Sequence, residues 1–152
     1  MSMIEERLKA DGVILPEPAA AVANYVPFVI SGAHVFVSGQ VSLGPDGLVT
    51  GKLGAEHDVA SGQTAARLCG INLLAQLKAA LGDLERVKRV VKLGGFVNAT
   101  PDFTDIPQVI NGCSDLMVTA FGEAGRHARS AVACPTLPLG CAVEIDGVFE
   151  VI

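Results

Sequence analysis

Two stretches with helical periodicity, each flanked by apolar runs rich in β-branched residues, constrain most strongly what this chain can fold into. Apolar residues recur at helical spacing over residues 58–81, and Gly82 follows as a C-terminal stop. A second helix is expected to begin after Asp105, with Pro107 in its first turn, and to end near Phe121. The strand-helix-strand order therefore occurs twice, which predicts an α+β fold whose two helices pack on one face of a sheet.

The strands expected around these helices are apolar runs bounded by glycine, proline or turn residues. Gly94 and Gly95 interrupt the longest run and predict a bulge or kink there. A short amphipathic helix over residues 4–10 is expected as an addition outside the core. The predicted strands are 25–30, 34–37, 87–97, 129–136 and 141–151, of which the first two form a hairpin and the last two a final pair.

The chain of 152 residues has the length of a single domain, which typically buries about 70% of its unfolded surface. We expect one domain over residues 1–152, with an N-terminal extension over 1–18. Half of the residues are hydrophobic and the mean hydropathy is +0.46, yet no apolar run approaches the roughly 18 residues of a membrane span. We therefore expect an apolar second sheet face that is buried against other subunits. The charged N-terminus does not fit a signal peptide, so a cytoplasmic location is expected.

Charge and cysteine spacing argue against two classes of ligand. The formal net charge is −5, the pI is about 5.1, and the 11 basic residues are scattered, which disfavours binding to a nucleic-acid backbone. The four cysteines form no CxxC pair and the three histidines lie at unrelated spacings, so no metal site is expected. We interpret the cysteines as reduced thiols in the core.

Arg129 and Glu144 stand within two runs that otherwise have the composition of buried strands. A buried charge costs several kcal/mol unless a partner compensates it, so each is expected to face a counter-ion, a ligand or a subunit boundary. Arg129 suits bidentate binding of a small carboxylate, and a structural salt bridge explains it equally well. Glu144 alternates with Val143 and Ile145 and so lies on the opposite face from them. There it is either a proton donor or water-orienting group with a raised pKa, or a solvated strand residue.

Three further positions are candidates for the same site. Gly39, within Ser38-Gly39-Gln40, ends an apolar strand and would let the backbone approach a ligand closely, although a plain strand-to-turn transition explains it too. Tyr25 is the only tyrosine, and Asn111 lies on the second expected helix. Taken singly, each is compatible with a structural role.

Three segments carry a resemblance to a known family: Val37-Ser38-Gly39-Gln40-Val41, Ala128-Arg129-Ser130-Ala131-Val132 and Val143-Glu144-Ile145. With them the chain resembles the longer branch of the RidA/YjgF family of reactive-intermediate deaminases, also labelled endoribonuclease L-PSP, over about residues 25–151. The resemblance implies a chorismate-mutase-like fold with a mixed sheet. It also implies a homotrimer with three clefts between subunits, in which the apolar sheet face lines the centre.

The activity that the resemblance implies is hydrolysis of enamine and imine products of PLP enzymes, such as 2-aminoacrylate, to 2-keto acids and ammonia. By position, Arg129 would bind the substrate carboxylate, Glu144 would orient or activate the attacking water, and the backbone at Ala131 would bond the imine side. The cleft would be lined by Tyr25, Gly39 and Asn111. No metal or organic cofactor is implied. The common family pattern has cysteine at the position of Ala131, so any role of that thiol is absent here.

Other functions remain open alternatives. A non-catalytic metabolite-binding or sensor protein would hold a keto acid or amino acid in the same cleft. A ribonuclease, which the family label suggests, is disfavoured by the acidic pI and by the lack of a basic surface with aromatic residues. Chorismate mutase activity rests on fold analogy alone. We therefore expect a small 2-imino or 2-keto acid as the ligand, with neither nucleic acid nor membrane as a partner.

Overall fold

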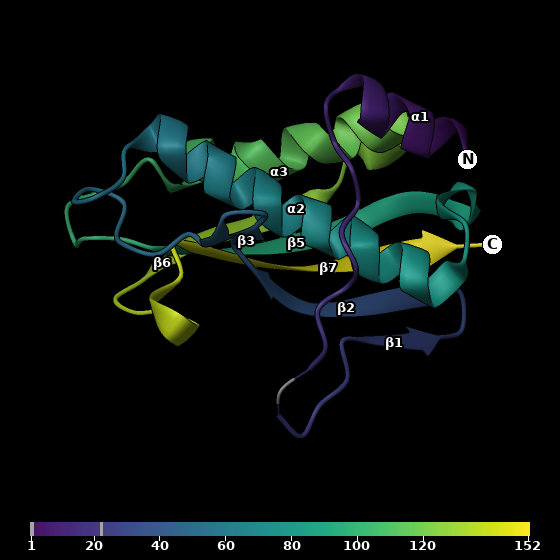
Figure 1. Ribbon diagram of the computed structural model, residues 1–152, viewed down its shortest axis with the longest axis horizontal. Coiled ribbons are helices and arrows are strands. Elements are labelled where there is room, and N and C mark those ends of the chain that lie inside the picture. The colour runs from purple at the N-terminus through teal and green to yellow at the C-terminus, as the bar shows by residue number, and fades with distance from the viewer. Residues whose placement is uncertain (1, 22) are drawn as a thin grey trace.

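A five-stranded sheet organises the structure, and the helices cover one of its faces (Figure 1). The computed structural model describes residues 2–21 and 23–152. The strand order is β1-β2-β7-β5-β6; β5 and β6 are parallel and the other neighbours antiparallel, so the sheet is mixed. The strands are β1 (Phe28–Ser31), β2 (His34–Val41), β5 (Val87–Asn98), β6 (Ala128–Cys134) and β7 (Val143–Val151), while β3 (Leu43–Gly44) and β4 (Gly47–Leu48) form a separate hairpin.

The C-terminal half of the sheet differs from the sequence-based expectation. The last two strands do not pair with each other, because β5 lies between β6 and β7. A parallel pair needs a long crossover, and the helix between β5 and β6 provides it. The register of β5 is irregular before Lys92, not at the two glycines. Gly94 and Gly95 instead leave room for neighbouring side chains, those of Asp146 and Ile110.

Three helices, rather than two, form the helical layer: α1 (Met3–Ala10), α2 (Val59–Leu81) and α3 (Ile106–Phe121). α2 lies where the sequence predicts a helix: its N-cap is Asp58, which forms a capping box with Ser61, and its C-cap is Gly82. α1 contributes the buried Ile4 and Leu8 to the core, so it is part of this layer and not an addition outside it. No helix within the described residues is long and apolar enough to cross a membrane.

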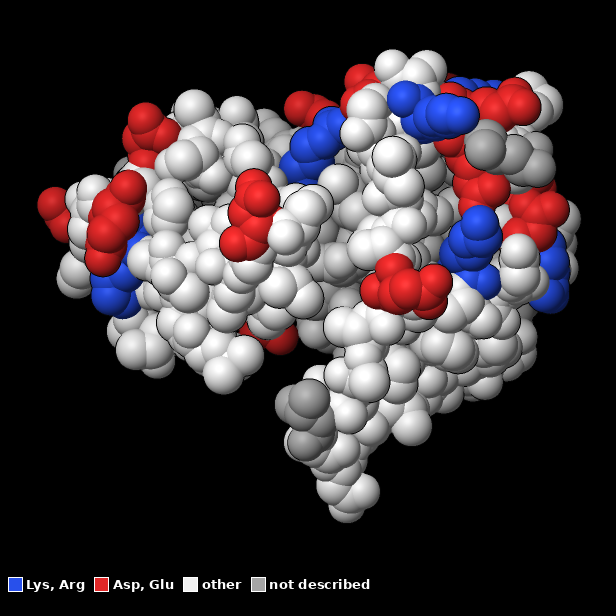
Figure 2. Space-filling view, viewed as in Figure 1, with Lys and Arg blue, Asp and Glu red and all other residues white. Residues whose placement is uncertain are grey.

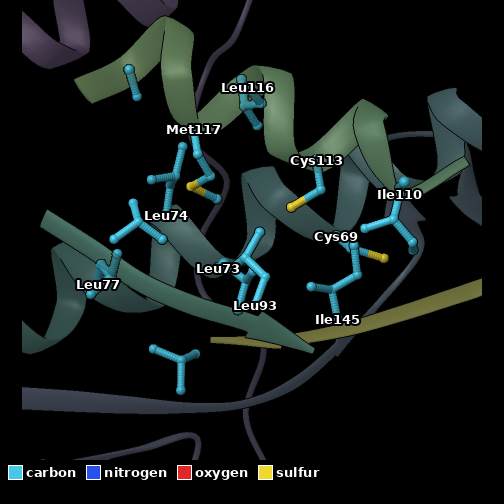
Figure 3. Close-up of a cluster of buried hydrophobic side chains, with 14 of the residues drawn as sticks. Cys69, Leu73, Leu74, Leu77, Leu93, Ile110, Cys113, Leu116, Met117 and Ile145 are labelled. Carbon is cyan, nitrogen blue, oxygen red and sulfur yellow. The ribbon is translucent and has the colours of Figure 1, made fainter. Parts of the chain in front are cut away.

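The hydrophobic core lies between the helices and the sheet. Leu73 of α2 and Leu116 of α3 pack in one buried cluster with Leu93 of β5 and Ile145 of β7 (Figure 3). Of the four cysteines, all free thiols, three are buried as predicted: Cys69, Cys113 and Cys141. Cys134, at the end of β6, is partly exposed because an edge strand is covered on fewer sides.

The sheet face opposite the helices, here called the open face, is mixed and not apolar as predicted. Along β7, the side chains that alternate with the buried ones are Glu144, Asp146, Val148 and Glu150. Phe36 of β2 pairs with Val148 and is 46% exposed, and Val132 of β6 is 48% exposed. The open face therefore combines acidic groups with exposed apolar ones, since alternation sends every second residue there whatever its polarity.

Candidate functional site

Arg129 lies on the edge strand β6, and α3 holds its side chain. It is in register with Leu93, which is buried beneath the helices, so the two side chains share the helix-covered face. Arg129 Nη1 donates to Oδ1 of Asn111 at 2.7 Å and to Oγ of Ser114 at 3.2 Å. The Nε and Nη2 groups donate to no side chain or carbonyl within residues 2–21 and 23–152. The guanidinium thus keeps one edge of parallel N–H groups free, the geometry that binds a carboxylate.

His127 bonds the same Ser114 hydroxyl that accepts from Arg129. Its Nε2 is 2.9 Å from Ser114 Oγ, and its Nδ1 is 2.6 Å from the carbonyl oxygen of Gly125. A carbonyl can only accept, so Nδ1 carries the proton and Nε2 accepts from the Ser114 hydroxyl. Burial lowers the pKa of His127, the hydrogen bond to Gly125 opposes this, and the positive charge of Arg129 lowers it further. The imidazole is therefore held in its neutral form near neutral pH.

These side chains line an open groove of about 250 Å³ between α3 and β6, together with Asp115, Val118 and Arg126. The sequence-based prediction included Asn111 and Arg129 but missed Ser114 and His127. One signal could have indicated Ser114: it follows Asn111 by three residues on a helix, so both lie on the same helix face.

Glu144 lies on the open face, as its alternation with Val143 and Ile145 predicts. The neighbouring strand β2 has a β-bulge at Ser38 and Gly39, between Val37 and Gln40, and it continues to Val41 instead of ending at Val37 as predicted. A Cβ at position 39 would come within 3.0 Å of the Glu144 carboxyl carbon and closer still to Oε2. The bulged glycine therefore provides the space that the carboxyl group occupies.

The surroundings of Glu144 favour its neutral form. Burial raises its pKa, and the negative charge of Asp146 raises it further. No donor among the described residues forms a hydrogen bond with its carboxyl group, so both oxygens are available to a ligand or to water. Tyr25 is 50% exposed, and its neighbour Val26 accepts a hydrogen bond from Ser38 Oγ at 2.7 Å, which places this segment beside the bulge.

The predicted site residues thus fall into two groups within one chain. Arg129, Asn111 and Ala131 lie at β6 and α3 on the helix-covered face. Tyr25, Gly39 and Glu144 lie at or beside the bulge, with Glu144 on the open face. Because Arg129 and Glu144 occupy opposite faces of the sheet, they form neither a salt bridge nor a common cleft in a single chain. Asn111 holds Arg129 and does not line a space shared with Glu144.

No cluster of three or more His, Cys, Asp or Glu side chains in the described part of the chain is arranged to hold a metal ion. Figure 2 shows basic side chains scattered over one face, with acidic groups among them and no continuous basic stripe. That surface does not have the charge distribution of a nucleic-acid interface.

Comparison with known proteins decides the family. Residues 5–149 match the family model described as "YjgF/chorismate mutase-like, putative endoribonuclease". The chain belongs to this family. The predicted RidA/YjgF membership and the chorismate-mutase-like fold are thereby confirmed.

Three relatives span nearly the whole chain. Protein TCP17 of Trypanosoma cruzi is 50% identical over 149 residues, which cover 97% of this chain and 93% of that protein. The structure of Atu1372 from Agrobacterium tumefaciens, a protein of unknown function, is 51% identical, with 98% and 92% of the two chains covered and a TM-score of 0.92. A Shewanella oneidensis protein that carries the endoribonuclease description is 39% identical, with 99% and 100% covered and a TM-score of 0.95.

Proposed function

We propose that this chain is an imine and enamine deaminase that hydrolyses small 2-imino acids, of the 2-aminoacrylate type, to 2-keto acids and ammonia. The observation that carries the proposal is the guanidinium of Arg129, which α3 holds by Nη1 alone so that its Nε and Nη2 edge stays free for a carboxylate. A relative supports a ligand of this size: TdcF of Escherichia coli has a structure with bound serine. It is 26% identical, with 88% and 93% of the two chains covered and a TM-score of 0.63.

A complete site needs two copies of the chain, because Arg129 and Glu144 lie on opposite faces of the sheet. In a homotrimer, the Arg129 group of one subunit would face the Glu144 group of the next, and three equivalent clefts would result. The exposed Phe36 and Val132 of the open face would be covered by this assembly. Tyr25 and Gly39 would then belong to the Glu144 half of each cleft.

The chemistry requires orientation, a water molecule and proton transfer. An enamine first tautomerises to the imine, whose carboxylate binds Arg129. The oxygen of water attacks the C=N carbon while Glu144, as carboxylate, accepts a proton from the water and passes it to nitrogen. In the carbinolamine, the hydroxyl proton is then transferred through Glu144 to the amino nitrogen, the C–N bond breaks as the C=O bond forms, and ammonia leaves. A raised pKa brings Glu144 closer to the value that suits proton transfer near neutral pH. The backbone at Ala131, on the unpaired edge of the sheet, would bond the imine nitrogen.

Subunit mixing tests this proposal. Imines generated in situ by an amino-acid oxidase are trapped with semicarbazide, and faster loss of the imine measures turnover. Arg129→Ala and Glu144→Ala should each be inactive, with Arg67→Ala, an arginine of α2 that pairs with Asp11 and does not line the groove, as the matched control. After the two inactive variants are unfolded together and refolded as mixed trimers, about one quarter of the sites should combine an intact Arg129 with an intact Glu144.

Regained activity would establish both the deaminase and the shared site. Activity of the wild type without any gain on mixing would contradict the shared site. An inactive wild type that still binds 2-keto acids through Arg129 would favour the alternative, a non-catalytic metabolite-binding or sensor protein.

A further inference from the structure

Two polar residues of the groove between α3 and β6, Ser114 and His127, have no role in the proposed hydrolysis. Together with Arg129 they form a chain of hydrogen bonds with a defined direction. Arg129 Nη1 donates to Ser114 Oγ, the Ser114 hydroxyl donates to His127 Nε2, and His127 Nδ1–H donates to the Gly125 carbonyl. Each bond fixes the direction of the next, because guanidinium can only donate and a carbonyl can only accept.

We propose that Ser114 and His127 are positioning residues for Arg129: they fix Nη1 on α3, and His127 takes up a proton when an oxyanion ligand binds the free Nε and Nη2 edge. This inference rests on the proposed role of Arg129 as the carboxylate anchor. It adds two residues on which ligand affinity depends although neither touches the ligand.

The proton uptake follows from the charges around His127. Protonated His127 would direct Nε2–H at the same hydroxyl oxygen that already accepts from Arg129, so two cations would share one oxygen atom. An anion on Arg129 offsets this repulsion. The other charged groups at the groove are Asp115 of α3 and Arg126 of the turn before β6. The effect of Arg126 is small, because its Nη1 is 3.8 Å from Glu123 Oε1 and its side chain is 71% exposed.

Two further side chains, Cys113 and Arg89, lie near the network. Burial raises the pKa of the Cys113 thiol to about 12, despite the nearby Arg129, so the thiol remains neutral. Arg89 reaches this region through Nη2, which donates to the carbonyl of Arg126 at 2.8 Å, and guanidinium stays charged. His127 is therefore the group in the network whose charge changes as the pH falls below neutral.

NMR titration of the histidine ring signals tests the network without substrate or turnover. We expect the pKa of His127 to lie below the ordinary value of 6.5. It should rise in Arg129→Gln, because repulsion by the guanidinium is removed, and in Ser114→Ala, because the hydroxyl that connects His127 to Arg129 is removed. His57 is the internal control: its ring also bonds a serine hydroxyl, Ser61 Oγ at 3.0 Å, and a carbonyl, Thr50 O at 2.7 Å, but no arginine joins it. An unchanged His127 titration in Arg129→Gln would overturn the proposal.

A stable carboxylate, 2-oxobutanoate, then tests the coupling. It should raise the pKa of His127 in the wild type but not in Arg129→Gln, and it should leave the His57 signals unmoved. By linkage, its affinity should increase as the pH falls, because the ligand-bound protein gains the proton on His127 more readily than the free protein does. Binding through Arg129 with no shift of His127 would overturn the coupling.

Variants of the two residues separate positioning from general structure. Ser114→Ala and His127→Ala should each weaken 2-oxobutanoate binding by about tenfold, and should raise KM more than they lower kcat. His127→Gln supplies an oxygen that accepts from Ser114 but cannot titrate, so it should restore affinity at pH 7.5 without the gain at low pH. If His127→Gln keeps the full pH dependence, His127 is not the responsible group. Absence of turnover with an intact coupling would count against the deaminase alone.

Discussion

Gly39 lies directly against the carboxyl group of Glu144, and a Cβ at position 39 would come within 3.0 Å of the Glu144 carboxyl carbon. Gly39→Ala should therefore push the carboxyl away from its place and lower deaminase activity at least about tenfold. The fold should lose no more than about 1 kcal/mol, because the end of a flexible side chain can move. Activity and urea unfolding, measured on the same preparation, separate the two effects.

Gly94→Ala is the matched control for this substitution. Its Cβ would come within 3.2 Å of the Asp146 carboxyl carbon, so it disturbs a carboxylate of the same strand that transfers no proton in the proposed reaction. Equal loss of activity in Gly94→Ala and Gly39→Ala would show that the sheet, and not the position of Glu144, is responsible.

Glu144→Gln should stabilise the protein while it abolishes turnover. Burial, with Asp146 adding to it, raises the pKa of Glu144 above its ordinary value of 4.5, so the folded state holds the proton more tightly than the unfolded state does. Wild-type stability therefore decreases as the pH rises from about 4.5 through the folded-state pKa, and the penalty is fully present above that value. The glutamine variant lacks the penalty.

The difference in unfolding free energy between Glu144→Gln and wild type should thus grow with pH and stay within about 1 kcal/mol, since solvent screens a partly exposed group. Thermal unfolding at a series of pH values measures it. Glu123→Gln, whose side chain is 91% exposed, should show no such trend. A gain that is the same at pH 4 and pH 8 would refute the electrostatic explanation.

Leu8→Ala should destabilise the protein by about 2–5 kcal/mol, because Leu8 is 1% exposed and packs within the core. Met3→Ala, at a position of the same helix that is 63% exposed, should have almost no effect. Urea unfolding of both variants tests whether α1 is part of the core. Similar stabilities for the two would indicate an appended helix, as the sequence alone suggested.

Native protein should expose one reactive thiol per chain. Burial raises the pKa of Cys69 well above its ordinary value, that of Cys113 to about 12 and that of Cys141 to about 11, so these groups are both covered and protonated. Cys134 is partly exposed. Ellman's reagent should therefore titrate one thiol rapidly and four in guanidinium, and Cys134→Ser should remove the rapid reaction.

Local chemistry explains what could be predicted from the sequence. The bounds of α2 were predictable because Asp58 and Gly82 cap the helix through their own side-chain and backbone properties. The face of Glu144 followed from simple alternation with its neighbours. Resemblance in three short segments indicated the family, which the match over residues 5–149 confirms.

Long-range pairing explains what could not be predicted. The position of β5 between β6 and β7 depends on a crossover that no local pattern reports. Ser114 and His127 form a hydrogen bond although they lie 13 positions apart in the sequence. The bulge at Gly39 leaves space for the side chain of Glu144, which lies 105 residues later. The location of Arg129 and Glu144 on opposite faces of the sheet likewise could not be predicted, because it depends on the register of β6 and β7 within the sheet.

Helix α3 performs two tasks with adjacent residues. Ile110 and Cys113 are fully buried in the core, while Asn111 and Ser114, each the next residue along, grip the guanidinium of Arg129. A rigid helix cannot turn one side without turning the other. A change of core volume beneath α3 should therefore rotate the helix slightly and so displace Arg129 Nη1, which Asn111 and Ser114 hold. Substitutions that repack this core to raise thermal stability should therefore also change the proposed ligand affinity of Arg129. Ile110 and Cys113 would then affect binding although neither contacts the ligand.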